Sequence, residues 1–455
     1  MLHVHRSERA DALVAPLAAV LGEPAADPFT PDVVAVPTRG VERWLAQRLS
    51  HHLGAGPGGG AGVCANVSFD PPARLVATAL AGALGGDPDE DLWDRERLTW
   101  PVLETLDAAA HEPWFAPVAR YLGEEDDELR RGRRLALAGR LAGLFSRYAA
   151  QRPDLLTAWA AGRDEDGAGA PVPGDLAWQP LLLRRVRAAV GVPSPAERLP
   201  DALAALRERP GSAALPARLS VFGPTHLPEA QLRVLTALGE HRDVHLWLPH
   251  PSPALWQAVE QRAPGPLRRS EHRSPARHPL LASLGRDVAE LGHRLRGVAG
   301  RDEHHPAPAP PATLLGTLQR ELRADAPGAA PHPLDPGDRS VQVHACHGRA
   351  RQVEVLREVL VGLFADDPDL EPRDVLVMCP DIESYAPLLS ATFTVASDGE
   401  HHAHPGRSFR VSLADRSPRQ VNPLLDLLAT LLEMADGRVT EIGRASCRER
   451  VSTIV

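Results

Sequence analysis

The sequence contains no lysine: all 50 of its Lys and Arg residues are arginines. A P-loop places a lysine on the β- and γ-phosphates of a nucleotide, so a working P-loop is excluded. Enzymes that form a Schiff base on a lysine are excluded too. The same holds for protein kinases, which need a lysine on a strand, and for nucleases that combine acidic residues with a catalytic lysine. The absence therefore removes the commonest lysine-dependent routes of phosphoryl transfer and covalent catalysis.

Aromatic residues and cysteines are also scarce. Aromatics make up 4% of the chain, and the four cysteines, Cys64, Cys346, Cys379 and Cys447, form no Cys-x-x-Cys pair. Scattered cysteines in a long chain are typical of reduced thiols. No apolar run reaches the roughly 18 residues of a membrane span, and Met1–Ala10 lacks the apolar core of a signal peptide. We therefore expect a soluble, cytoplasmic protein.

The balance of acidic and basic residues limits the kinds of partner that the chain is expected to bind. With 59 acidic residues against 50 basic ones, the formal net charge is −9. A generally basic nucleic-acid binder is not indicated, but a local basic patch on an acidic chain remains open.

The first fifty residues follow the pattern of an α/β fold. Leu2–His5 alternates like a short strand, Asp11–Leu21 has apolar residues at helical spacing, and Val33–Val36 is an unbroken apolar run. A second helical stripe covers Val41–Leu49. This order predicts a parallel sheet covered on both faces. Since ligands of such sheets bind beyond the carboxyl ends of the strands, the loop Pro37–Arg43 is the predicted binding region.

A large helical insertion is predicted to interrupt this sheet. Residues 72–215 show amphipathic helical segments with few β-branched runs, and residues 216–300 return to strand-like patterns. We therefore assign residues 1–71 and 216–300 to one α/β domain. Its returning elements are a strand, a helix and a strand at Leu219–Gly223, Glu229–Leu238 and Val244–Leu248.

A linker and a second α/β domain are predicted to follow. Residues 301–339 are rich in Pro, Arg, His and Ala, which favours an exposed, partly disordered linker. Residues 340–440 look like the start of the second domain. Its predicted elements are the strand Ser340–Ala345, the helix Ala350–Phe364, the buried strand Asp374–Met378 and the helix Pro423–Met434.

An ordered series of short motifs runs from the first strand to about residue 434. The motifs are Val36–Leu45 (VPTRGVERWL), Leu144–Tyr148 (LFSRY) with Gln151–Asp154 (QRPD) and Trp159, Trp178–Leu181 (WQPL), Phe222–Gly223 with Leu227–Pro228 and His245–Leu246, His278–Gly285 (HPLLASLG), and His344–His347 (HACH) with Arg351–Leu356 (RQVEVL), Asp374–Met378 (DVLVM), Asp381–Ile382 and Tyr385. Together the series resembles the RecC family, the gamma subunits of exodeoxyribonuclease V (RecBCD).

The resemblance implies a superfamily 1 helicase-like fold whose ATPase motifs are lost, in agreement with the missing lysine. It implies a non-catalytic, DNA-binding scaffold subunit that holds RecB-like and RecD-like partners. Such a subunit channels the separated single strands and scans one of them for Chi during double-strand break repair by homologous recombination. The chain itself would hold no cofactor and no metal, because ATP and Mg would belong to the partner subunits.

The resemblance also assigns DNA contacts by position. They fall on Pro37, Thr38, Arg39 and Arg43 after the second strand, on Pro71 and Ala77, and on Gly143, Leu144, Ser146 and Arg147 in the helical insertion. The positions transfer while the residue identities differ, so the resemblance does not specify which DNA sequence would be read.

The segment Arg130–Arg152 carries seven arginines and no acidic residue. Such a run is often only a solvated face. Here Phe145 and Tyr148 lie within it, and proteins hold single strands by stacking bases on aromatic rings beside cationic groups. We therefore add Tyr148 to the candidate DNA contacts.

Other interpretations follow from the same residues. His401, His402 and His404 lack a fourth ligand at ligand spacing, so we predict no metal site there. A stand-alone nucleotide-binding α/β enzyme is one alternative function, although no turn after a predicted strand reads Gly-x-Gly-x-x-Gly. A protein-interaction scaffold without DNA contact is another. Residues 441–455 match no expected element, and we interpret them as an anomalous, foreign tail on a truncated gene model.

Overall fold

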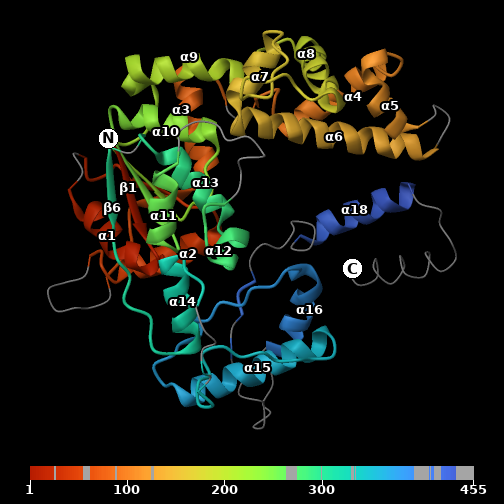
Figure 1. Ribbon diagram of the computed structural model, residues 1–455. Helices are drawn as coiled ribbons and strands as arrows, with labels where there is room; N and C mark the ends of the chain where they lie inside the picture. Colours follow the sequence, from red (N-terminus) through yellow and green to blue (C-terminus); the bar gives the residue numbers. More distant parts are fainter. Residues whose placement is uncertain are drawn as a thin grey trace. The chain divides into compact units, whose positions relative to one another are not determined.

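The computed structural model of the chain contains two compact units, Met1–Ser340 and Val341–Val455 (Figure 1). The residues that it describes are 1–24, 27–54, 62–87, 90–123, 128–262, 274–298, 300–328, 333, 335–393, 409, 411–413 and 422–436, without the side chains of 128–131 and 436. The predicted tail and His401, His402 and His404 lie outside these residues.

The first unit is built on a six-stranded sheet in which every strand pair is parallel. The strand order is β3-β2-β4-β5-β1-β6. The strands are β1 (Leu2–Ser7), β2 (Asp32–Ala35), β3 (Val67–Asp70), β4 (Arg218–Phe222), β5 (Asp243–Pro249) and β6 (Arg301–His304). The predicted parallel α/β sheet is confirmed, including its interruption between β3 and β4.

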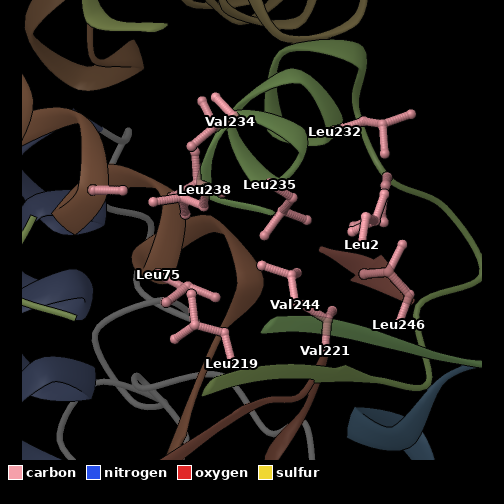
Figure 2. Close-up of a cluster of buried hydrophobic side chains, with 14 of the residues drawn as sticks. Leu2, Leu75, Leu219, Val221, Leu232, Val234, Leu235, Leu238, Val244 and Leu246 are labelled. Carbon is pink, nitrogen blue, oxygen red and sulfur yellow. The ribbon is translucent and has the colours of Figure 1, made fainter. Parts of the chain in front are cut away.

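Helices cover both faces of this sheet. Leu219 and Val221 of β4 pack beneath α10 (Glu229–Gly239) and α3 (Pro72–Leu84), in a core that Figure 2 shows. Phe222 and Trp247 belong instead to the core under α1 (Val14–Gly22) and α2 (Arg39–Ser50). This alternation follows from the two-residue period of a strand. Helices α11 (Pro253–Glu260), α12 (Pro279–Leu284) and α13 (Arg286–Leu295) complete the covering elements.

The segment between β3 and β4 is helical, as predicted. It contains α3, α4 (Arg95–Ala108), α5 (Ala116–Leu122), α6 (Glu128–Gln151), α7 (Pro153–Ala160), α8 (Trp178–Val190) and α9 (Pro195–Glu208). Most of these helices share a separate apolar core that includes Leu98, Phe115, Phe145 and Leu182. Proline in the first turn of α3, α7 and α9 helps to set where these helices begin. The finer division into domains 1–71, 72–215 and 216–300 stays a prediction.

The expectation of a partly disordered linker over residues 301–339 is wrong for much of its length. Arg301–His304 forms β6, which pairs with β1, and Leu314–Ala324 forms helix α14. The α14 N-cap is Thr313, whose hydroxyl accepts a hydrogen bond from the Gly316 amide at 3.1 Å. The sequence analysis predicted neither element, because proline dominates the composition around both segments.

In the second unit the two predicted helices are present and the two predicted strands are not. The described helices are α15 (Arg349–Asp366), α16 (Ile382–Phe393), which sequence reasoning overlooked, and α18 (Pro423–Asp436). Residues 340–345 and 374–378 form no strand, and Val343 and Leu376 are 92% and 83% exposed. An apolar run supplies strand propensity, but a strand also needs a hydrogen-bonded neighbour. Neither segment has one among the described residues.

Two further features concern the helices and the cysteines. No helix in the described part is long and apolar enough to cross a membrane. The three described cysteines, Cys64, Cys346 and Cys379, are free thiols.

The imidazole of His250, at the end of β5, gives the first unit a pH-dependent stability. Its Nε2 is buried without a hydrogen-bond partner in the described part, and its ring lies edge-on to Trp256. Burial, and then the charge of Arg6, lowers the pKa of His250 from 6.5 to about 4, although Glu8 and Asp302 act the other way. The folded chain therefore favours the neutral form of the His250 ring.

We expect the free energy of unfolding to be highest above pH 6.5 and to fall between pH 6.5 and 4, because only the unfolded chain takes up the His250 proton there. This histidine alone should account for about 3 kcal/mol. Urea unfolding followed by circular dichroism across this range measures the effect. His250→Phe should flatten the pH profile relative to wild type, whereas His51→Phe, at an exposed histidine, should leave it unchanged. Equal pH profiles for wild type and His250→Phe would contradict the assignment.

Candidate nucleic-acid interface

The loop after β2 presents an exposed, positively charged helix start. Pro37, Thr38, Arg39 and Arg43 are all exposed. Thr38 is the N-cap of α2, and its hydroxyl accepts a hydrogen bond from the Val41 amide at 3.3 Å. Arg39 and Arg43 stand one helical turn apart, and neither has an ion pair in the described part of the chain. A helix N-terminus with free backbone amides and two guanidinium groups is suited to binding a phosphate group.

Two neighbouring strands bring further residues to the same edge of the sheet. Pro71, exposed, follows β3, which pairs with β2. Gly223 follows β4 on the other side of β2, and a Cβ added to it would lie 4.0 Å from Cδ of Pro37. Its φ of +76° favours glycine at this turn. Ala77 is half-buried on α3, one and a half turns into that helix. The predicted edge loop and Pro71 are thus brought together.

Helix α6 carries a row of outward arginines. Arg133, Arg140 and Arg147 are exposed, seven residues apart, and form no ion pair with other described residues. Seven residues are nearly two turns, so the three side chains lie along one face at intervals of about 10.5 Å. Arg134 instead pairs with Asp107. The opposite face, with Ala138, Leu141 and Phe145, is buried in the helical core. We name Arg133, Arg140 and Arg147 the arginine row.

The other candidates on α6 are turned partly inward. Leu144 packs against the helical core. The Ser146 hydroxyl donates to the Ala142 carbonyl at 3.0 Å, so it is used within the helix. Gly143 is covered by Arg95, whose Nε would lie 3.4 Å from an added Cβ. Among the candidates on this helix, Arg147 therefore has the exposed side chain.

The two aromatic residues of the segment differ. Phe145 is completely buried and packs in the helical core. Tyr148 is half-buried. Its ring lies edge-on to that of Trp159, with the ring centroids 5.7 Å apart, and its hydroxyl donates to Gln179 Oε1 at 3.1 Å. Burial raises the pKa of Tyr148, although Arg152 and Arg147 act in the opposite direction. Its phenol is therefore neutral at physiological pH, and its role in DNA contact stays a prediction.

The loop after β4 connects the two groups of candidates. Gly223, at its start, lies beside Pro37, and His226 accepts a hydrogen bond from Gln151 Nε2 at 2.6 Å. Arg294 of α13 donates to Gln151 Oε1 at 3.3 Å and to the Leu227 carbonyl at 3.2 Å. Sequence reasoning missed His226 and Arg294, because their partners are 67 to 143 residues away and leave no local pattern.

The exposed candidates include guanidinium groups and backbone amides at a helix start, and both kinds of group bind phosphates in proteins. The end of α6 and the edge loop both contact the loop after β4, through Gln151 and His226 at one end and Pro37 and Gly223 at the other.

The comparisons with known proteins agree on one family. The model of the RecC N-terminal domain matches residues 2–325. A curated relative from Mycobacterium tuberculosis, named RecBCD enzyme subunit RecC, is 50% identical over 96% of this chain and 40% of its own length. The protein of the same name from Mycolicibacterium smegmatis is 48% identical over 96% of this chain and 39% of its own length. The one from Escherichia coli is 28% identical over 96% of this chain and 41% of its own length. The chain spans about 40% of the length of these relatives.

Proposed function

The chain belongs to the RecC family, and we propose that it acts as a non-catalytic, DNA-binding scaffold portion of a RecBCD-type exodeoxyribonuclease V. In this proposal it contributes to double-strand break repair by homologous recombination. It contacts RecB-like and RecD-like partners, holds a separated single strand and takes part in scanning that strand for Chi. ATP and Mg would be bound by the partner subunits.

The observation that supports DNA contact most directly is the set of exposed arginines without acidic partners. Arg39 and Arg43 stand at a helix start beyond a strand end, and the arginine row follows one face of α6. Elsewhere in the first unit arginines are commonly paired, as Arg207 is with Glu240 at 2.7 Å and Arg233 with Asp154 at 2.6 Å. Arginines kept free of carboxylates are available to phosphates.

The helicase-like fold belongs to the same proposal. The supporting features are the parallel sheet, the helical segment between β3 and β4, and a second unit with its own helical core. The absence of lysine agrees with a motor-like fold that does not hydrolyse ATP.

Charge reversal tests the proposed DNA contact. In the double variant Arg43→Glu with Arg147→Glu we expect affinity for a labelled single strand to fall at least about tenfold at 0.1 M salt, because two phosphate contacts are lost. The slope of log K against log salt should become shallower by about 1.4. Fluorescence anisotropy over a salt series gives both quantities.

The control carries the same change in net charge at arginines that already have acidic partners. Arg163→Glu with Arg207→Glu removes the pairs with Glu165 and Glu240 and should keep most of the affinity and the slope. If both double variants bind like wild type, the protein-interaction scaffold without DNA contact is the better description. If both weaken equally, the effect is one of net charge and not of these positions.

A further inference from the structure

One face of the sheet carries a row of stacked imidazoles at its β6 end. His3 and His5 of β1 lie beside His245 and Trp247 of β5, and His305 directly follows β6. The His3 and His245 rings are 4.6 Å apart, those of His5 and Trp247 3.9 Å, and those of His5 and His305 5.3 Å. His5 is only 7% exposed. His245 is also buried, whereas His3 and His305 are partly buried, so the cluster calls for a chemical explanation.

Two of these imidazoles meet a carboxylate. His5, Glu303 and His305 each offer a ligand atom, and the three atoms lie within 4.8 Å of one another. The distance between His5 Nδ1 and His305 Nε2 is 3.1 Å. In a tetrahedral zinc site, with bonds of about 2.0–2.1 Å, two nitrogen ligands stand about 3.3 Å apart. We propose that His5, Glu303 and His305 bind a divalent transition-metal ion of the zinc type, with the remaining position open to water.

A second layer of contacts holds these ligands in place. His5 Nε2 lies 3.1 Å from His245 Nδ1, so the ring can bind an ion through Nδ1 while it donates its other N–H to His245. Metal-binding histidines usually have such a partner. The backbone amide of His305 donates to the Arg6 carbonyl at 2.8 Å. Glu8 fixes the flanking residues through His304 Nε2 and the Ala307 amide, both at 2.8 Å.

Access from solvent also fits this role. The Glu303 side chain is 39% exposed, which leaves a path for an ion from solvent.

The competing explanation is a chain of neutral imidazoles that share hydrogen bonds without an ion. The distances between His305, His5 and His245 allow it, and Arg301 lies 3.2 Å from the Glu303 carboxylate. The two explanations differ in the use of Glu303. A hydrogen-bonded imidazole chain does not need this carboxylate, whereas the ion does. An ion would also connect β1 to the edge strand β6 and stabilise the folded chain by mass action.

Zinc titration of the full 455-residue chain, after chelator treatment, tests the proposal. The parent protein should carry His401→Ala, His402→Ala and His404→Ala, so that this other histidine group cannot contribute. We expect one ion per chain by calorimetry, and a tetrahedral absorption spectrum with cobalt. Glu303→Gln and His305→Ala should each weaken binding at least tenfold, and His245→Asn by 10- to 100-fold. His51→Ala, at an exposed histidine, should bind like the parent.

Two results would overturn the proposal: no saturable zinc binding to the parent, or binding that both Glu303→Gln and His305→Ala leave unchanged. Circular dichroism of each variant shows whether it is folded, and both substituted side chains are partly exposed, which favours folding. The outcome does not depend on DNA binding, because none of the arginines proposed to contact DNA belongs to this cluster.

Discussion

Replacing Arg218 with alanine is expected to lower the free energy of unfolding of the first unit by about 3–5 kcal/mol. This arginine begins β4, and its guanidinium pairs with Asp32 of β2 at 2.7 Å. It also donates to the carbonyls of Val20, Leu21 and Glu23 at the end of α1. The two charged side chains are 16% and 21% exposed. Their removal from water makes the loss of one partner costly.

The expected cost is large because one side chain satisfies several groups. The last carbonyls of a helix have no partner within it, and a cation there also interacts favourably with the helix dipole. Without Arg218 the Asp32 carboxylate and the carbonyls of Leu21 and Glu23 lose this donor, whereas the Val20 carbonyl keeps the Glu23 amide at 3.3 Å. Urea unfolding measures the loss. The matched control is Arg207→Ala, which breaks an exposed pair with Glu240 and should cost at most about 1 kcal/mol. Equal losses in the two variants would show that Arg218 acts as an ordinary surface residue.

A double-mutant cycle separates the pair from the helix cap. Arg218→Ala combined with Asp32→Asn should cost clearly less than the sum of the single changes, because the carboxylate is no longer left charged and unpaired. The part of the Arg218→Ala effect that persists in the Asp32→Asn background then measures the contacts with α1. If that part is zero, the hydrogen bonds to the α1 carbonyls do not contribute.

The predictability of the sheet depended on where each strand lies. Strand β4 and strand β5 are covered on both faces, so Leu219–Phe222 and Val244–Leu248 are almost continuously apolar and could be recognised from sequence. Edge strand β6 has the sequence Arg-Asp-Glu-His and no apolar signal. It is held by its ladder with β1 and by pairs such as Arg6 with Asp302 at 2.6 Å. Partners 296 residues apart leave no local pattern to read.

The candidate interface was predictable in position and less so in orientation. The rule that ligands bind beyond strand ends led to Pro37–Arg43, which is exposed at the sheet edge. On α6 the family resemblance marked a run of neighbouring residues, although a helix turns adjacent side chains to different faces. The apolar positions Ala138, Leu141, Ala142 and Phe145 recur at helical spacing and indicate the buried face. That spacing separates Phe145 from Arg147 without any structure.

The second large prediction concerns Phe145. Truncation to alanine should lower the free energy of unfolding by about 3–5 kcal/mol, because the ring is completely buried in the helical core and its removal leaves a cavity. Phe145→Leu keeps much of the volume and should cost clearly less. Thermal and urea unfolding of both variants give the two values. A loss below about 1 kcal/mol for the alanine variant would contradict the burial.

The same pair of variants decides between packing and base stacking. If Phe145 only packs, Phe145→Leu, which stays folded, should bind a single strand with wild-type affinity. If the ring stacks on a base, that variant should lose about 1–3 kcal/mol of binding free energy. Tyr148→Phe serves as the neighbouring control, since it removes the hydrogen bond to Gln179 and keeps the ring. Weaker DNA binding by folded Phe145→Leu, with Tyr148→Phe unaffected, would mean that α6 presents its other face to DNA. Unchanged binding by both would leave the arginine row as the part of α6 that contacts the strand.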